Sequence, residues 1–209
     1  RPIVQPSLPL PGPATVILGP DISDQADPTA LESARQVLQG RLDGTLESVA
    51  QVTVQAGNLR VELASAEDIS ATVQLAGQMG GLVFFDSAQP VEVGTPVPEG
   101  AQVIMTDDDV SQAQAVYDRM NYDWTVLLQL TPEGAQKLAD YTLENDGHYL
   151  AMAYDGAVIF SSRITAPFLE DQVIIGGGLD QTAAKSLAAR LGSGRLPFRL
   201  VAVEVIRSP

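Results

Sequence analysis

Residues 130–162 read LTPEGAQKLADYTLENDGHYLAMAYDGAVIFSS, and residues 176–197 read GGGLDQTAAKSLAARLGSGRLP. The first stretch begins with Thr131-Pro132-Glu133, which combines a hydroxyl cap, a proline at the first helical position and an acid in the first turn. These residues predict a helix that continues to about residue 145. Further on, Asp155-Gly156 lies between two apolar runs and predicts a type I′ hairpin.

The second stretch predicts a glycine-rich turn followed by a helix. Gly176-Gly177-Gly178 supplies the permissive backbone that a tight strand-to-helix turn needs. Asp180 caps the helix, and Gly192 or Gly194 ends it. The apolar stripe of this helix consists of Ala184, Leu187, Ala188 and Leu191.

Further elements are expected on either side of these two stretches. The acids at residues 107–109 are expected to open a helix that continues to about Met120. Residues 124–130 and 173–175 are predicted strands, and so are residues 198–206, in which apolar and polar positions alternate. Residues 88–102 hold three prolines and two glycines and are expected to form a linker or long loop at a subdomain boundary.

The N-terminal part of the chain predicts a strand followed by an amphipathic helix. Residues 15–18 form a short apolar run. Asp27-Pro28 then places a cap before a proline at the first helical position. The apolar face consists of Leu31, Ala34, Leu38 and Leu42, and the helix ends near Gly44. Arg35 and Arg41 are expected to lie off that face.

Residues 51–85 predict two more strands, a second helix and a third strand. Residues 51–55 and 59–63 alternate on either side of Gly57-Asn58, as in a hairpin. Residues 65–68 resemble a capping box and predict a helix that stops near Gly80. Residues 82–85 follow as a strand. The order is therefore that of a split βαββαβ, ferredoxin-like unit, with both helices on one face of an antiparallel sheet.

The amino-acid composition argues against several classes of function. The chain has 209 residues, a net charge of −14, no cysteine, and Lys137 and Lys185 as its only lysines. Nucleic-acid binding needs a basic surface, and so does attraction to anionic lipids, so neither nucleic acid nor direct membrane binding is expected. Disulfides, thiolate zinc sites and cysteine nucleophiles are excluded.

Nothing in the sequence resembles a membrane span or a signal peptide. No run of 18 apolar residues occurs, and residues 1–13 hold five prolines without an apolar core. This segment is expected to be an extended lead or linker. The chain does not begin with methionine, so we expect an excerpt or a processed product.

No residue is nominated as catalytic, cofactor-binding or metal-binding. His148 is the only histidine, stands at the start of a strand and lacks a G-x-S-x-G partner motif, so a surface or strand-end role is expected. The acids Asp107, Asp108 and Asp109 lack EF-hand spacing, which favours helix capping over calcium binding. The Gly176-Gly177-Gly178 run fits neither the phosphate-loop nor the dinucleotide pattern.

The two stretches quoted first resemble one family, the protein-export subunit SecD and its fused form SecDF, and the resemblance extends over residues 15–208. In the first stretch it is carried by Glu133-Gly134-Ala135, Thr142, Asn145, Gly147, Leu150-Ala151 and Asp155-Gly156-x-Val158. In the second it is carried by Gly177, Leu179, Asp180, Ala184-x-x-Leu187-Ala188 and Ser193-Gly194-x-Leu196-Pro197. Arg41-x-Asp43 stands where the family has an arginine-x-aspartate element. The family's D-L-x-G-G element is missing before residue 15, and Asp180 replaces a threonine cap.

The resemblance implies an α+β fold, namely a ferredoxin-like base with an inserted α+β head and a last strand that returns to the base. On this basis residues 14–88 plus 198–207 are expected to form the base, and residues 89–197 the head. A hinge would lie at the linker prolines and at Gly192-Ser193-Gly194.

The resemblance also implies a function. The expected role is a non-enzymatic extracytoplasmic domain of a SecD-like translocase subunit, which binds unfolded preprotein leaving the Sec channel and assists its release. The implied partners are preprotein, SecF and the SecY channel complex, with no cofactor. The preprotein-binding residues are unknown, but a broad, partly apolar groove on the head is expected. The alternatives are a membrane-anchored interaction module uncoupled from transport and an extracytoplasmic hydrolase.

Overall fold

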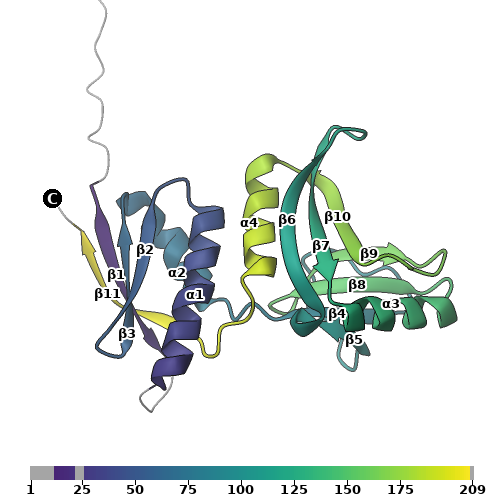
Figure 1. The fold of residues 1–209 in the computed structure, drawn as a ribbon, viewed down its shortest axis with the longest axis horizontal. Coiled ribbons are helices and arrows are strands. Elements are labelled where there is room, and N and C mark those ends of the chain that lie inside the picture. The colour runs from purple at the N-terminus through teal and green to yellow at the C-terminus, as the bar shows by residue number, and fades with distance from the viewer. Residues whose placement is uncertain (1–11, 22–25, 208–209) are drawn as a thin grey trace, which may run out of the picture.

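A computed structural model describes residues 12–21 and 26–207. The predicted lead therefore lies almost wholly outside the described residues. Figure 1 shows two lobes side by side, with helix α4 between them. The smaller lobe consists of β1 (Ala14–Pro20), α1 (Pro28–Thr45), β2 (Ala50–Gln55), β3 (Asn58–Leu63), α2 (Ile69–Gly77) and β11 (Leu200–Arg207).

The larger lobe holds the middle of the chain, in two sheets and two helices. Its elements are β4 (Leu82–Ser87), β5 (Val103–Thr106), β6 (Val110–Asp118), β7 (Asp123–Leu130), α3 (Pro132–Glu144), β8 (Tyr149–Tyr154), β9 (Ala157–Arg163), β10 (Gln172–Leu179) and α4 (Gln181–Gly192). One sheet has the strand order β5-β4-β8-β9, and the other has the order β10-β7-β6. The molecule is thus an α+β protein.

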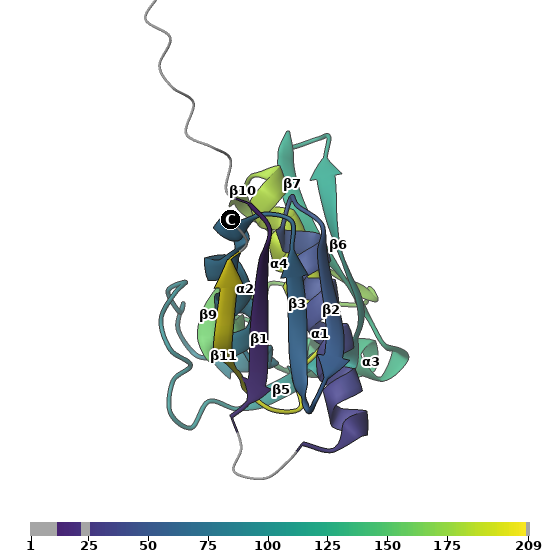
Figure 2. The same cartoon turned by 90° about the vertical axis from the view of Figure 1, so that its left-hand side faces the viewer.

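The sheet of the smaller lobe is antiparallel, with the strand order β11-β1-β3-β2. Ala14 at the start of β1 pairs with Arg207 at the end of β11. This pairing confirms the prediction that the last strand returns to the first sheet. Figure 2 shows one face of this sheet open toward the viewer, with α1 and α2 behind the other face.

Helix α1 has the N-cap and the apolar face that the sequence predicts. The Asp27 carboxylate accepts hydrogen bonds from the backbone N–H groups of Thr29, at 3.1 Å, and Ala30. The apolar stripe packs on the sheet with the strand residues of the same core. The buried apolar side chains of α1 are Leu31, Ala34, Val37, Leu38 and Leu42.

Strand β4 does not close the sheet of the smaller lobe. It pairs instead with β5 and β8 in the larger lobe, and β11 lies beside β1. The loop that follows β4 also belongs to the larger lobe, since Gly94 N donates to Val158 O and Val97 N to Gly156 O. The chain therefore leaves the smaller lobe directly after α2, and residues 88–102 are not the connection. An apolar run such as residues 82–85 fits either sheet, so its pattern could not show which one it joins.

The predicted helix over residues 107–120 is wrong. Residues Asp107–Asp109 form one 3-10 turn, and the chain then extends as β6, which pairs with β7. The acids do cap, because the Asp109 carboxylate accepts from Thr106 N, but they cap a single turn. Half-buried Ala113 and Ala115 alternate with exposed Gln112 and Gln114, which is a strand period.

Three smaller predictions also need correction. The glycines of residues 176–178 lie inside β10, at a shift of register against β7, rather than in a turn before α4. The hairpin between β2 and β3 turns at Ala56 and Gly57, which both have positive φ, rather than at Gly57-Asn58. Ser65 caps a 3-10 turn, and α2 then ends at Gly77, three residues before Gly80.

Candidate functional site

The helix caps and the hairpin turn within residues 130–162 and 176–197 position the elements of the site. Thr131 Oγ1 accepts from Gly134 N at 3.0 Å and starts α3. Asp155 and Gly156 have φ values of 51° and 80°, as the predicted type I′ turn between β8 and β9 requires. Asp180 Oδ1 accepts from Ala183 N at 2.7 Å and starts α4. All three predictions are confirmed.

A hollow of about 420 Å³ lies between α3, β9, β10 and the segment that joins the two strands. We call residues 164–171 the strap and this hollow the strap groove. Figure 1 shows β9 and the end of α3 at the side of the larger lobe that faces away from the smaller lobe. Residues of both elements line the groove. Its apolar lining includes Leu138, Leu150, Phe160, Ile164, Phe168, Val173 and Ile174.

The strap is fastened to the lobe at its ends and in its middle. Ile164 O accepts from Gly147 N, and Asp171 O accepts from Leu130 N at 2.8 Å. Between these points, Phe168 N donates to the hydroxyl of Thr142, which itself donates to the Leu138 carbonyl on α3. Because Thr142 is buried, this hydroxyl is a fixed support for the strap. The strap is therefore an ordered wall of the groove.

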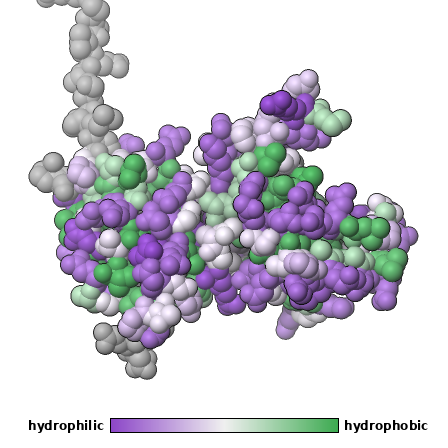
Figure 3. All heavy atoms as spheres, in the orientation of Figure 1, coloured by the Kyte–Doolittle hydropathy of each residue, from purple (hydrophilic) through white to green (hydrophobic). Residues whose placement is uncertain are grey.

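Exposed apolar side chains surround the groove. Ile174 on β10 is 60% exposed, and Leu169 on the strap is 82% exposed. Leu169 and Leu143 also border a second hollow, of about 340 Å³, on the outer side of α3. Figure 3 shows hydrophobic atoms gathered at this end of the larger lobe. Arg163 and Glu170 are the charged residues of the groove lining, so the surface can bind apolar side chains beside polar ones.

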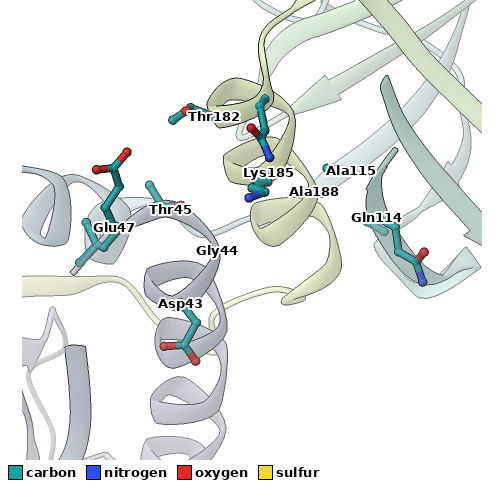
Figure 4. Close-up of a pocket in the computed structure, with 12 residues that line it drawn as sticks. Asp43, Gly44, Thr45, Glu47, Gln114, Ala115, Thr182, Lys185 and Ala188 are labelled. Atoms are coloured by element: carbon teal, nitrogen blue, oxygen red, sulfur yellow. The ribbon is translucent and has the colours of Figure 1, made fainter. Parts of the chain in front are cut away.

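A third hollow lies between the lobes. It has a volume of about 670 Å³ and is open to solvent. Figure 4 shows Asp43, Thr45 and Glu47 at the end of α1, opposite Thr182 and Lys185 of α4. Its walls come from both lobes, so its shape depends on how the lobes are placed.

Arg41 holds the junction between the lobes. The sequence suggested a side chain off the apolar face, but Arg41 is completely buried. Its guanidinium donates to the Leu75 carbonyl on α2 and to four acceptors on the two chain segments that join the lobes. These four are the carbonyls of Gln78, Met79 and Gly194 and the hydroxyl of Ser193. Burial lowers the pKa of Arg41, although the nearby Tyr154 and Asp155 oppose this effect.

The hairpin between β8 and β9 reaches the same junction. The Asp155 carboxylate accepts from Gly80 N at 2.6 Å and from Gly81 N at 3.3 Å. On α4, the Arg190 guanidinium carbon lies 4.7 Å from the centre of the Tyr154 ring, which is a cation–π contact. Asp155 and Gly156, which are part of the family resemblance, form the hairpin turn, and the Asp155 side chain also binds the segment that joins the lobes.

The groups that could suggest catalysis are engaged in structural contacts. His148 Nδ1 lies 2.9 Å from Asp86 Oδ1, and the Tyr141 hydroxyl donates to the same carboxylate. Buried Asp109 forms an ion pair with Lys137 at 2.7 Å. In the part of the chain that the structure describes, no three His, Asp or Glu side chains are grouped as metal ligands would be. No helix within residues 12–21 and 26–207 is long and apolar enough to cross a membrane.

Comparison with known proteins identifies relatives over most of the chain. Residues 84–198 match the family model described as the P1 head subdomain of SecDF. The protein translocase subunit SecD of Acidaminococcus fermentans is 29% identical over 182 residues, which cover 86% of this chain and 40% of that protein. SecDF of Thermus thermophilus is also 29% identical, over 98% of this chain and 31% of that protein. The chain thus spans less than half the length of these relatives.

Two solved structures have the same fold. A crystal structure of SecDF in a super-membrane-facing form has a TM-score of 0.74 at 27% identity. The match covers 96% of the present chain and 32% of the SecDF chain. A second chain, from work on SecDF as a membrane component that enhances protein export, has a TM-score of 0.71 at 27% identity. The match covers 93% of the present chain and the whole of that second chain.

Proposed function

This chain belongs to the SecD/SecDF family of protein-translocation subunits, and we propose that it binds unfolded preprotein in the strap groove and assists its translocation and release. The observation that carries the proposal is the groove itself. It lies within residues 84–198, the part that matches the P1 head subdomain, and it combines an apolar lining with exposed apolar side chains beside it.

The groove suits a partner without a fixed sequence. Apolar hollows bordered by exposed Ile174 and Leu169 offer contacts to many different aliphatic and aromatic side chains. A volume of about 420 Å³ accommodates a few side chains at a time. The net charge of −14 favours neutral or basic segments over acidic ones. These properties support transient binding of unfolded chain better than recognition of one folded partner.

We assign the two lobes to the base and the head of the family. The strand order β11-β1-β3-β2, with α1 and α2 on one face, supports a split βαββαβ, ferredoxin-like base in which β11 is the fourth strand. The sheet pairings support a head that begins at β4 and ends with α4. The base is then residues 14–77 plus 198–207, and the head is residues 82–192.

The place of the chain in the cell follows from the same proposal. We assign it to the extracytoplasmic side of a bacterial membrane, as part of a longer translocase subunit that acts with SecF and the SecY channel. It would act by binding and moving polypeptide, without catalysing a reaction. The observation behind this part of the proposal is that His148, Asp86 and Asp109 are each held in local contacts.

Binding of one protein in two states tests the proposal. The probe is ribonuclease A, native or reduced and carbamidomethylated, with fluorescence anisotropy as the readout. We expect the unfolded form to bind and the native form to bind at least tenfold more weakly. Ile174→Gln in the groove should weaken binding several-fold. The control is Ile206→Gln on β11, which is also an exposed isoleucine but lies in the smaller lobe. Equal affinity for both forms of the probe would sink the proposal.

A further inference from the structure

The strap groove lies between the edges of two sheets. Strand β10 is an outer strand of the sheet β10-β7-β6, and β9 is an outer strand of the sheet β5-β4-β8-β9. Both strands contribute residues to the groove lining. The groove is therefore bordered by main-chain groups of edge strands as well as by apolar side chains. An edge strand can pair with an added chain unless something covers it.

The register of β10 shows which of its groups point to the free edge. Leu130 N donates to Asp171 O, so this antiparallel pair is hydrogen-bonded. Along such a ladder, hydrogen-bonded pairs alternate with pairs that are not hydrogen-bonded. The next residues of β10 that bond to β7 are therefore Val173 and Ile175. Gln172 and Ile174 therefore direct their N–H and C=O groups away from β7, toward the side on which no strand of the described chain pairs.

Two other sheet edges of this molecule, those of β2 and β9, carry hydrogen bonds from outside their ladders. The Gln39 side chain closes the edge of β2, since its amide donates to Ala50 O and accepts from Val52 N. The first half of β9 pairs with the loop after β4, because Val158 O accepts from Gly94 N and Val158 N donates to Thr95 O. The β9 edge thus already holds an extended segment of chain. No comparable hydrogen bond reaches Gln172 or Ile174 main-chain groups from outside the ladder within residues 12–21 and 26–207.

We propose that polypeptide enters the strap groove as an extended strand that pairs with the free edge of β10. This inference rests on the proposed function and adds the mode of recognition to it. Main-chain pairing is indifferent to sequence, while alternate side chains of the added strand point into the apolar hollow. The acidic balance of the chain, 26 acids against 12 bases, favours neutral or basic strands. The preferred occupant is an unfolded segment with alternating apolar residues and few acids.

A labelled peptide tests the role of main-chain hydrogen bonds. The probe is a seven-residue peptide of alternating valine and threonine with a lysine added at each end. A second version carries N-methyl groups on two adjacent central residues, so both edges of the strand lose a donor. We expect at least tenfold weaker binding of this version. A control version, with the two methyl groups at its N-terminal residues, should bind within about threefold of the parent.

A matched pair of variants tests the same contact from the protein side. Ile174→Pro removes the outward N–H, and proline is tolerated in an edge strand whose N–H points away from its neighbour. Ile174→Thr also shortens the apolar side chain but keeps the N–H. We expect Ile174→Pro to lose at least tenfold in affinity for the valine-threonine peptide, and Ile174→Thr to lose no more than threefold. Circular dichroism and thermal unfolding check that both variants fold.

The outcomes separate this inference from the proposed function. If the central methyl groups and Ile174→Pro leave binding unchanged while unfolded ribonuclease A still binds, strand pairing is wrong and the groove binds by side chains alone. If neither the peptide nor unfolded ribonuclease A binds the wild-type chain, both proposals are overturned. Loss of binding that is specific to the central methyl groups and to Ile174→Pro supports strand pairing.

Discussion

A single buried guanidinium ties the two lobes together. Arg41 belongs to α1 in the smaller lobe, yet four of its five acceptors lie on the two segments that cross between the lobes. These acceptors are four backbone carbonyls and one hydroxyl. A buried charge of this kind is stable only while its hydrogen bonds are made. Arg41 therefore couples the placement of the crossings to the folding of α1.

Replacing Arg41 should be costly. In Arg41→Met the apolar part of the side chain remains, but the carbonyls of Leu75 and Gly194 and their neighbours lose their donor. We expect a loss of about 3 kcal/mol or more in the free energy of unfolding, measured by urea denaturation. Arg35→Met on the same helix is the control, because its pair with Glu32 is on the surface, and it should change stability little. Equal effects of the two substitutions would contradict the role of Arg41.

Asp86 provides a test by pH. Burial raises the pKa of Asp86, but hydrogen bonds from Tyr141 and His148 outweigh burial and hold this pKa below the usual value of an aspartate. A depressed carboxyl pKa contributes stability above the unfolded value, and this contribution is lost as the pH falls through the folded pKa. Wild type should therefore be more stable than Asp86→Asn at pH 5, with the difference shrinking below about pH 4. Urea unfolding at pH 5, 4 and 3 measures it, and a constant difference would refute this account.

At the scale of elements, α3 is placed by a close approach to the turn before β6. A methyl group added to Gly134 would lie 2.5 Å from the Asp109 carbonyl oxygen. The same turn supplies the Asp109 carboxylate that pairs with Lys137 on α3. Glycine at this position therefore lets the first turn of α3 rest against the backbone of the 3-10 turn, which fixes one wall of the strap groove.

Gly134→Ala should thus destabilise the larger lobe. The backbone of Asp109 cannot move without disturbing its buried contacts, so we expect a loss of about 1 to 3 kcal/mol. Gly77→Ala is the control, because a methyl group there would meet nothing within 4 Å, and it should be neutral or slightly stabilising. Thermal unfolding of the two variants gives the comparison. An unaffected melting temperature in Gly134→Ala would show that the contact is not tight in solution.

Sequence patterns predicted those elements whose signals are local. Thr131, Asp155-Gly156 and Asp180 act on partners within a few residues, so their caps and turns could be located from the sequence. The assignment of β4 to a sheet depends on pairing with β8, far along the chain, and no local pattern contains that information. The acids before β6 predict a helix start, whereas the alternation after them is the period of a strand.

The site was harder to predict for the same reason. Arg41 finds its acceptors 34 and 152 positions away, so its burial cannot be inferred from the helix that carries it. The strap has no periodicity, and its only sequence signal is the apolar pair Phe168-Leu169 after a proline. Thr142 was recognised as part of the family spacing, but its contact with Phe168 becomes visible only in the folded chain.

For the whole molecule, the contact between α1 and α4 sets the position of the lobes. A methyl group on Gly44 of α1 would collide with Ala189 of α4, so the two helices lie close together there. One turn away, Thr45 Oγ1 and Ser186 Oγ are 3.2 Å apart. The helices belong to different lobes, and any hinge movement between the lobes must change this contact.

A designed disulfide can report whether the contact persists in solution. The natural chain has no cysteine, so Thr45→Cys with Ser186→Cys creates the only pair. The two hydroxyl oxygens are 3.2 Å apart, so cysteine sulfurs at these positions would be close neighbours. We expect intramolecular oxidation, seen as a mobility shift on non-reducing gels. The single-cysteine variants are the controls and should show no such shift. Failure of the double variant to oxidise would mean that the lobes are held apart in solution.

Site-specific crosslinking locates the bound polypeptide most directly. A benzophenone is attached through a cysteine at Ser162 in the strap groove or, as a control, at Gln51 on β2 of the smaller lobe; both side chains are exposed. With reduced, carbamidomethylated ribonuclease A as the partner, we predict strong adducts from position 162, few from position 51, and few from either with native ribonuclease A. Adducts of equal strength from both positions, or none from position 162, would contradict binding in the groove.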